Sequence, residues 1–345
     1  MIATQSRRPP LLPRGGHVRV VSPAAPAIAF SPVRAERARR ALTDAGYRVS
    51  LGEHAALTTA DGQCAGTAEQ RASDLMAAFA DPEVDAIMAA TGGASTRELL
   101  PLLDAGFIAG HPKPFVGHCD TAWLNQYLLS EARLTSFYGA TFMVTFGEAG
   151  GPFPESPDNL HRALGRGDRL TCRPVPTRTR VFHPWSVPKR EALPRPREVP
   201  GGLTWLRPGR ARGPVLCMEL SMLTGIVADF GLELDGHVLA WDISPYSDVP
   251  MSRTLREAAR AVDLSGLAGM IVGPDVRYGL DEWAGMVREA ARSAGPLGEG
   301  PLVVNADIGH MAPTWVVPYG ADAELDAAAG TVEFPRGSDP ARETR

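Results

Sequence analysis

Short apolar runs alternate with amphipathic stretches through the first 150 residues of the chain. Residues 17–21, 47–51 and 84–90 are runs of strand length, and residues 32–45 and 67–79 carry apolar side chains at helical spacing. Strands that alternate with helices indicate an α/β domain with a mainly parallel sheet. Ligands of such sheets bind beyond the carboxyl ends of the strands, so we expect the functional site at that edge.

The pattern changes after about residue 150 and becomes regular again only near residue 215. The intervening stretch is rich in proline and arginine, which predicts a connector with short strands and an extended loop. Beyond it, strand-like runs at residues 237–241, 269–272 and 302–305 alternate with helical patterns at 252–261 and 280–294. The chain therefore divides into a flexible N-terminus (1–16), an N-terminal α/β domain (17–165), a connector (166–213), a C-terminal domain (214–335) and a disordered tail (336–345).

The composition is that of a globular protein, with 345 residues of which 44% are hydrophobic and 21% are charged. A net charge of -4 gives no reason to expect nucleic acid or an acidic membrane surface as a partner. None of the four cysteines has C-x-x-C spacing, so we expect no metal site, and no motif implies an organic cofactor. No apolar run reaches the length of a signal-peptide core or a membrane span, which predicts a cytoplasmic protein with reduced thiols.

The most informative stretch is residues 113–121, Lys-Pro-Phe-Val-Gly-His-Cys-Asp-Thr. An apolar run ends at Gly117, Cys119 follows two residues later, and a helical pattern begins at once. A residue on a tight strand-to-helix turn projects away from the sheet, and the helix N-terminus behind it favours negative charge. Cys119 is therefore a candidate nucleophile, with a buried small hydrophobic residue or an inactivated site as the alternatives.

Three segments of the sequence indicate a particular protein family when they are taken together, although each alone would be a weak signal. Residues 64–93 run from Cys-Ala-Gly-Thr to a double glycine, residues 112–121 contain the cysteine turn, and residues 307–320 contain Asp-Ile-Gly-His and Pro-Tyr-Gly. Together they resemble the LD-carboxypeptidase family, serine peptidases with a Ser-Glu-His triad. Residues 137–140 and 146–148 are similar to the microcin C immunity branch of that family.

The resemblance covers roughly residues 17–335. It implies a Rossmann-like N-terminal α/β domain with a parallel sheet, and a smaller, β-rich C-terminal α/β domain of the swivelling type. It also implies an active site between the two domains and a homodimer.

The resemblance assigns roles residue by residue. Cys119 stands where the family has its nucleophilic serine, and His310 matches the catalytic histidine, a general base and acid. Asp242 falls at the triad glutamate but is one methylene shorter, so either the backbone shifts or the contact loosens. Backbone N–H groups of Gly93 and Asp120 are the expected oxyanion hole.

Other positions bear on the substrate. Gly92 allows a close backbone approach, and His118 replaces the family's tyrosine beside the nucleophile. Glu219 lies in Cys-Met-Glu-Leu where the family has Gly-Gly-Asn-Leu, and is either a ligand for a substrate amine or an ordinary surface carboxylate. Trp185 is either a stacking residue for the substrate or a packing residue.

The sequence supports three functions. The first is an LD-carboxypeptidase-like amide or peptide hydrolase, in which a Cys119-His310-Asp242 triad forms an acyl-enzyme from a small peptide, aminoacyl or acyl-amide substrate. The second is a cysteine-dependent acyltransferase or amide-forming enzyme in specialised metabolism, because thioesters react readily with amines. The third is an inactive binding homologue on the same scaffold.

Overall fold

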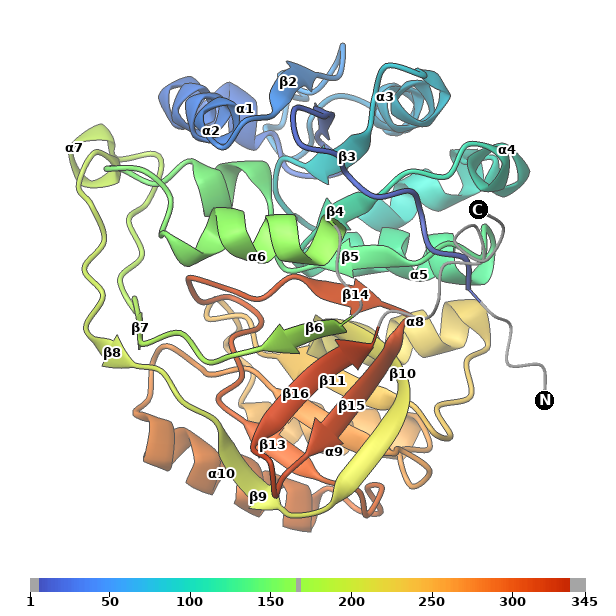
Figure 1. Ribbon diagram of the computed structural model, residues 1–345, viewed down its shortest axis with the longest axis vertical. Helices are drawn as coiled ribbons and strands as arrows, with labels where there is room; N and C mark the ends of the chain where they lie inside the picture. Colours follow the sequence, from blue (N-terminus) through green and yellow to red (C-terminus); the bar gives the residue numbers. More distant parts are fainter. Residues whose placement is uncertain (1–5, 166–168, 336–345) are drawn as a thin grey trace.

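The computed structural model describes residues 6–165 and 169–335. Its first sheet has six strands in the order β14-β5-β4-β3-β1-β2, all parallel except β14, which runs antiparallel to β5. In Figure 1 these strands and the blue-to-green helices form the upper half of the molecule. The strands are β1 (His17–Val21), β2 (Arg48–Leu51), β3 (Ala86–Ala89), β4 (Phe115–Gly117), β5 (Ser136–Tyr138) and β14 (Val317–Tyr319).

The helices of this half begin and end close to the predicted positions. The helix predicted over 67–79 is α3 (Ala68–Ala80), and it begins there because Thr67 and Gln70 form a capping box. Leu75 and Phe79 on its inner face are buried. The others are α1 (Ala27–Phe30), α2 (Pro32–Asp44), η1 (Thr96–Leu102), α4 (Ala105–Gly110), η2 (Cys119–Thr121), α5 (Ala122–Ser130), η3 (Phe142–Phe146) and α6 (Glu155–Leu164).

The second sheet has eight strands in the order β6-β16-β15-β10-β11-β12-β13-β9. Its centre, β10 to β13, is parallel, and the strands on both sides of it are antiparallel. The predicted α/β fold with a parallel sheet and a second, β-rich unit is therefore confirmed. The remaining elements are β10 (Arg210–Glu219), η4 (Leu220–Met222), α8 (Leu223–Phe230), β11 (Val238–Asp242), α9 (Met251–Ala261), β12 (Gly269–Val272), α10 (Leu280–Ser293), β13 (Leu302–Val304), β15 (Asp322–Asp326) and β16 (Thr331–Pro335).

The segment predicted as a connector contributes to the second sheet. Strand β6 (Arg169–Cys172) pairs with β16, and β9 (Thr204–Arg207) pairs with β13, so each forms one edge of the sheet. Between them lie the short pair β7 (Thr177–Arg178) and β8 (Val199–Pro200) and the single-turn helix α7 (Pro188–Glu191). Figure 1 shows this part running along one side of the molecule past both halves. The exact domain boundaries stay predictions.

A buried ion pair fastens this segment to the C-terminal half. The Nε of Arg178 donates to Oδ1 of Asp307 at 2.6 Å, and both side chains are almost fully buried. The backbone N–H of Thr179 donates to the carbonyl of Ala312 at 3.0 Å. Since His310 lies between these two anchor points, the segment holds the loop that carries it.

The N-terminus, predicted as a flexible arm, makes contacts with the N-terminal half. Arg7 exchanges backbone hydrogen bonds with Arg133 and Thr135, and Leu12 is buried in the core, so residues 6–16 are packed against the N-terminal half. Residues 1–5 and the predicted disordered tail, 336–345, lie outside the described residues.

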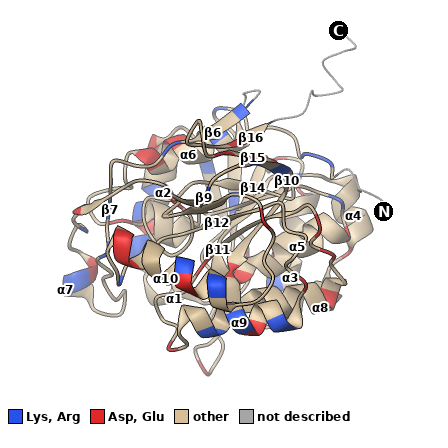
Figure 2. Ribbon diagram, turned by 90° about the horizontal axis from the view of Figure 1, so that it is seen from below, with Lys and Arg blue, Asp and Glu red and all other residues tan. Residues whose placement is uncertain are grey.

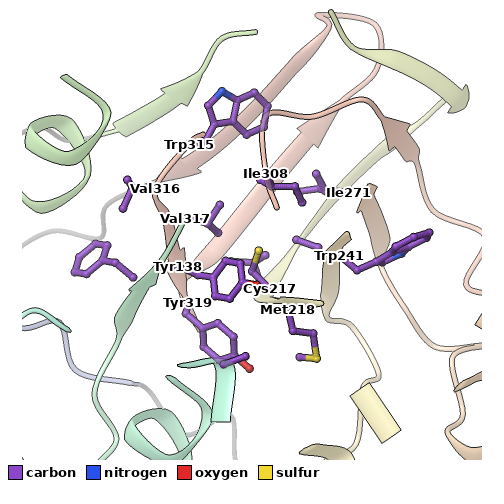
Figure 3. Packing of buried hydrophobic residues seen from close by; sticks show 14 of the residues in the cluster. Tyr138, Cys217, Met218, Trp241, Ile271, Ile308, Trp315, Val316, Val317 and Tyr319 are labelled. Carbon is purple, nitrogen blue, oxygen red and sulfur yellow. The ribbon is translucent and has the colours of Figure 1, made fainter. Parts of the chain in front are cut away.

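The two halves share one hydrophobic core. Figure 3 shows Tyr138 and Tyr319 from the first sheet beside Cys217 and Trp241 from the second. Burial raises the pKa of the Cys217 thiol well above its ordinary value, so this cysteine acts as a small apolar residue. The continuous core fixes the halves relative to each other and thereby the site between them.

Charges of both signs are mixed on the surface. Figure 2 shows arginines on both sides of a glutamate along α9, where Arg253 pairs with Glu257 at 2.8 Å. Among the described residues, no helix combines the length and the apolar character that crossing a bilayer requires.

Candidate active site

Cys119 occupies a strained turn between β4 and α5. Its φ of +62° lies in the left-handed region, which few non-glycine residues adopt. The turn is tight, since a Cβ at Gly117 would lie 2.4 Å from Thr121 Oγ1 and one at Gly92 would lie 2.8 Å from Cys119 Cβ. The Cys119 N–H donates to the Tyr138 hydroxyl at 3.1 Å. A reactive side chain held this way has the geometry of a nucleophile elbow.

Asp242 at the end of β11 binds His310 through a single oxygen. Its Oδ2 lies 2.5 Å from Nδ1 of the imidazole and accepts the His310 backbone N–H at 2.9 Å. Gly309 makes this possible: its φ is +89°, and a Cβ there would lie 2.2 Å from Asp242 Cγ. The close backbone approach brings the Asp242 carboxylate directly against the imidazole, so the contact between them is short and not loosened.

Charge stabilises this pair. Burial alone would lower the pKa of His310, but the charges and hydrogen bonds of Asp242 and Cys119 outweigh it and raise that pKa well above the ordinary value. Burial alone would raise the pKa of Asp242, but the imidazole of His310 outweighs it and lowers that pKa. The direction of both shifts favours a charged His310–Asp242 pair at the cavity that Cys119 also lines. A charged imidazolium near a thiol is an arrangement that can activate it as a nucleophile.

His118 adds a second imidazole. Its ring meets the His310 ring edge-on at 4.6 Å between centroids and lies 4.9 Å from the Tyr138 ring. Burial lowers the pKa of His118 to about 3, and the neighbouring His310 acts in the same direction. His118 is therefore uncharged at neutral pH, unlike His310.

The predicted oxyanion donors lie around the same turn. The Asp120 carboxylate accepts the backbone N–H groups of Ser95 and Thr96 at 2.9 and 2.8 Å, which ties the loop after Gly93 to the nucleophile turn. A Cβ at Gly93 would lie 2.6 Å from the Cβ of Ala24, so only glycine fits there. The Asp120 side chain thus has a positioning role that the sequence did not indicate, and the oxyanion role of the two N–H groups stays a prediction.

A cavity of about 1370 Å³ opens beside the thiol. Cys119, His118, His310, Gly92 and Gly93 line it, together with Trp185 of the connector segment and an aromatic rim formed by Phe30, Phe153, Phe182 and Tyr246. In this rim Phe182 and Tyr246 meet edge-to-face at 5.6 Å and are 51% and 64% exposed. A deep apolar cavity with a few convergent polar groups is typical of a small-molecule site.

One wall of the cavity is charged. Arg34 pairs with Glu148 at 2.8 Å and with Glu191 at 3.2 Å, Arg195 binds Glu148 at 2.7 Å, and the Arg34 guanidinium lies 4.7 Å from the centre of the Trp185 ring. Sequence reasoning missed this wall. The available signal was Arg34, a charged residue at a position on the buried stripe of α2.

Glu219 is buried and is therefore not an ordinary surface carboxylate. It lies opposite Asp242 in the β10–β11 register, and its carboxylate accepts the Ser221 N–H at 3.1 Å as the cap of η4. Burial raises the pKa of Glu219. It does not line the described part of the cavity, so contact with a substrate amine stays a prediction.

The side chains of His118, Asp242 and His310 form a compact polar cluster, in which one possible ligand atom from each lies within 4.8 Å of the others. Elements that are far apart in sequence meet here: the β4–η2 turn, the end of β11 and the loop after β13. The arrangement brings together Cys119, His310 and Asp242 as the resemblance implied.

Comparisons with known proteins identify the family. The family model of the LD-carboxypeptidase N-terminal domain matches residues 18–139, and that of the C-terminal domain matches residues 212–325. A Bacillus subtilis protein named "Probable murein peptide carboxypeptidase" is 26% identical over 337 residues, covering 96% of this chain and 95% of the relative. The microcin C7 self-immunity protein MccF of Escherichia coli is 22% identical over 328 residues, covering 90% of this chain and 91% of MccF.

The fold has solved counterparts. The structure of MccF in complex with aspartyl sulfamoyl adenosine superposes with a TM-score of 0.83 at 21% identity, covering 95% of this chain and 98% of MccF. The MccF-like protein from Bacillus anthracis gives a TM-score of 0.84 at 22% identity, covering 96% and 99%. Both family domains match in chain order and together cover more than half of the chain, so the chain belongs to the LD-carboxypeptidase family.

Proposed function

We propose that the protein is a cysteine-dependent hydrolase of small peptide or aminoacyl amides. Membership of a carboxypeptidase family supports a hydrolase that acts on peptides. The observation that carries the cysteine-dependent chemistry is the left-handed Cys119 turn facing a His310–Asp242 pair at 2.5 Å.

The reaction follows from the positions of these groups. The Cys119 thiolate attacks the substrate carbonyl carbon, and the resulting oxyanion is held by the Gly93 and Asp120 N–H groups. The C–N bond breaks as His310 gives its proton to the leaving amine, which leaves a thioester on Cys119. His310 then takes a proton from water, the hydroxide attacks the thioester, and the acid and free thiol are released. Asp242 keeps the imidazole oriented through both steps.

The cavity supports a substrate larger than one amino acid. Its volume of about 1370 Å³ exceeds the roughly 300–1,000 Å³ of ordinary ligand pockets. MccF was solved with aspartyl sulfamoyl adenosine, an aminoacyl nucleoside analogue, and another relative is named for murein peptides. We therefore propose an aminoacyl or short peptidyl amide as the substrate, with Trp185 in the cavity wall as a contact for its non-peptide part.

Product analysis tests this proposal. The protein is incubated with L,D-dipeptides, murein tetrapeptide and aminoacyl sulfamoyl adenosines, and released amines are quantified by mass spectrometry. We expect turnover with at least one class, and loss of it in Cys119→Ala and His310→Gln. Amide products after addition of free amines would reassign the protein as an acyltransferase. Absence of both hydrolysis and transfer would leave the binding homologue as the function.

We propose two further properties, the first from the family resemblance and the second from the apolar pattern of the sequence. They are a homodimer, which sedimentation analysis tests, and a cytoplasmic location, which cell fractionation tests.

A further inference from the structure

Two buried polar atoms in the cluster defined above have no partner among the described residues. They are Nε2 of His118 and Oδ1 of Asp242. His118 is 8% exposed and Asp242 is 1% exposed, so the bulk solvent does not satisfy them. A buried polar atom without a hydrogen bond calls for an explanation, and a bound water, a bound ion or a catalytic role can each supply it.

The ligand types favour a metal ion of the zinc class. A ring nitrogen of His118, a ring nitrogen of His310 and a carboxylate oxygen of Asp242 lie within 4.8 Å of one another. Zinc takes imidazole nitrogen and carboxylate oxygen at about 2.0–2.2 Å, and catalytic sites use three protein ligands. Tetrahedral ligands at that radius are roughly 3.4 Å apart, so small side-chain movements close the cluster around an ion.

We propose that His118, Asp242 and His310 bind one divalent transition-metal ion, with zinc as the best match. The tyrosine that the family resemblance places at residue 118 would supply no imidazole, so the site depends on His118. This inference concerns binding and does not rest on the proposed hydrolase activity.

The ion would inhibit the proposed chemistry. The His310 ring is held by Asp242 through Nδ1, and its raised pKa favours the protonated form. Binding the ion would release one proton from this ring to solvent, and the ring nitrogen that holds the ion could then no longer transfer a proton. Zinc would therefore act as a reversible inhibitor of this protein.

Another pair in the structure provides a matched control. His54 binds Asp74 through its backbone N–H at 2.9 Å and through Nδ1 at 2.8 Å, the same two groups that His310 uses towards Asp242. No second histidine joins that pair within the described residues. A two-residue His–Asp pair should bind zinc much more weakly than the three-residue cluster.

Isothermal titration of metal-free protein with Zn²⁺ tests the inference. We expect one site per chain in the wild type, a loss of affinity greater than about 100-fold in His118→Phe, and wild-type affinity in His54→Phe. The 100-fold threshold is chosen because loss of a group that only hydrogen-bonds to a metal ligand lowers metal affinity by up to about 100-fold, and loss of a ligand itself should lower it further. His118→Tyr, which restores the family residue, should behave like His118→Phe, and thermal melting of each variant checks that it is folded.

Two results would overturn the metal site: no stoichiometric Zn²⁺ binding by the wild type, or equal affinity in the wild type and both folded His118 variants. Titration with Co²⁺ gives an independent readout, because visible absorption bands of a tetrahedral site must appear in the wild type and disappear in His118→Phe. Failure of hydrolysis in the product assay would leave these binding results untouched, so the two proposals fail separately.

Discussion

Replacing Asp242 by asparagine tests how the site activates its thiol. The amide oxygen can still accept both His310 donors, which lie at 2.5 and 2.9 Å from Oδ2, but it carries no charge. A hydrogen bond to a charged group contributes about 1.5–3 kcal/mol and a neutral one about 0.5–1.5 kcal/mol. The two bonds together therefore lose about 2–3 kcal/mol, which corresponds to roughly 30- to 150-fold in rate.

The assay follows alkylation of Cys119 by iodoacetamide, measured by intact mass between pH 5 and pH 10. The protein carries Cys64→Ser, which removes the other partly exposed thiol. Because alkylation reports on the thiol itself, the assay needs no substrate. We expect Asp242→Asn to react roughly 30- to 150-fold more slowly at pH 7. Without the carboxylate charge the protonated form of His310 is less stable, and so is the thiolate that it stabilises. Asp74→Asn, which alters the matching pair with His54, should leave the rate unchanged.

The pH dependence of the free energy of unfolding provides a second test of the charged His310–Asp242 pair. In the folded protein the pKa of His310 is raised above its unfolded value near 6.5. His310 therefore contributes its full share to the free energy of unfolding below about pH 6.5, and this contribution is lost as the pH rises through the folded-state pKa. The pKa of Asp242 is lowered, so its contribution is lost as pH falls below about 3.8. Wild type and Asp242→Asn should therefore differ most in unfolding free energy between about pH 4 and 6.5. Equal alkylation rates together with parallel stability curves would refute the charged pair.

Three other substitutions probe the surrounding structure. Gly309→Ala places a Cβ 2.2 Å from Asp242 Cγ and should reduce both activity and stability. The control Gly330→Ala has open space for its Cβ and a φ of +67°, so it should lower the free energy of unfolding in urea by only about 1–2 kcal/mol. Arg178→Met leaves the buried Asp307 carboxylate without its ion-pair partner and should lower the free energy of unfolding by about 3–5 kcal/mol. The control Arg97→Met breaks an exposed ion pair and should lower it by at most about 1 kcal/mol. Similar losses in the two variants would contradict this reasoning. Trp185→Ala should raise KM roughly two- to tenfold at unchanged kcat, and an unchanged KM would indicate a packing role.

The sequence predicted the elements near the site well because their signals are local. The strand at 269–272 was predicted at the residues where β12 lies, and the capping box at Thr67 fixed the start of α3. The turn at Cys119 was also readable, because a glycine, a reactive side chain and a helical pattern follow each other within a few residues. The family motifs then supplied the two distant partners of the thiol.

What the sequence could not predict depends on contacts between distant segments. Strand β14 crosses into the first sheet, and the connector's β6 and β9 form edges of the second; neither follows from patterns of a few residues. The contact between Asp242 and His310 depends on the backbone at Gly309, which only the folded structure reveals. The sequence analysis named His118, Asp242 and His310 as site residues but did not indicate a metal site. These residues are separated by more than 60 positions in the chain and follow no metal-binding spacing.

The central claim is that Cys119 carries the acyl group of the substrate. The direct measurement is intact-mass analysis of protein quenched in acid within the first turnovers on an aminoacyl or peptidyl amide, followed by peptide mapping. The account predicts one acyl increment, located on Cys119, that disappears on longer incubation and never forms in Cys119→Ala. Turnover that continues in Cys119→Ala, or an increment on another residue, would contradict it.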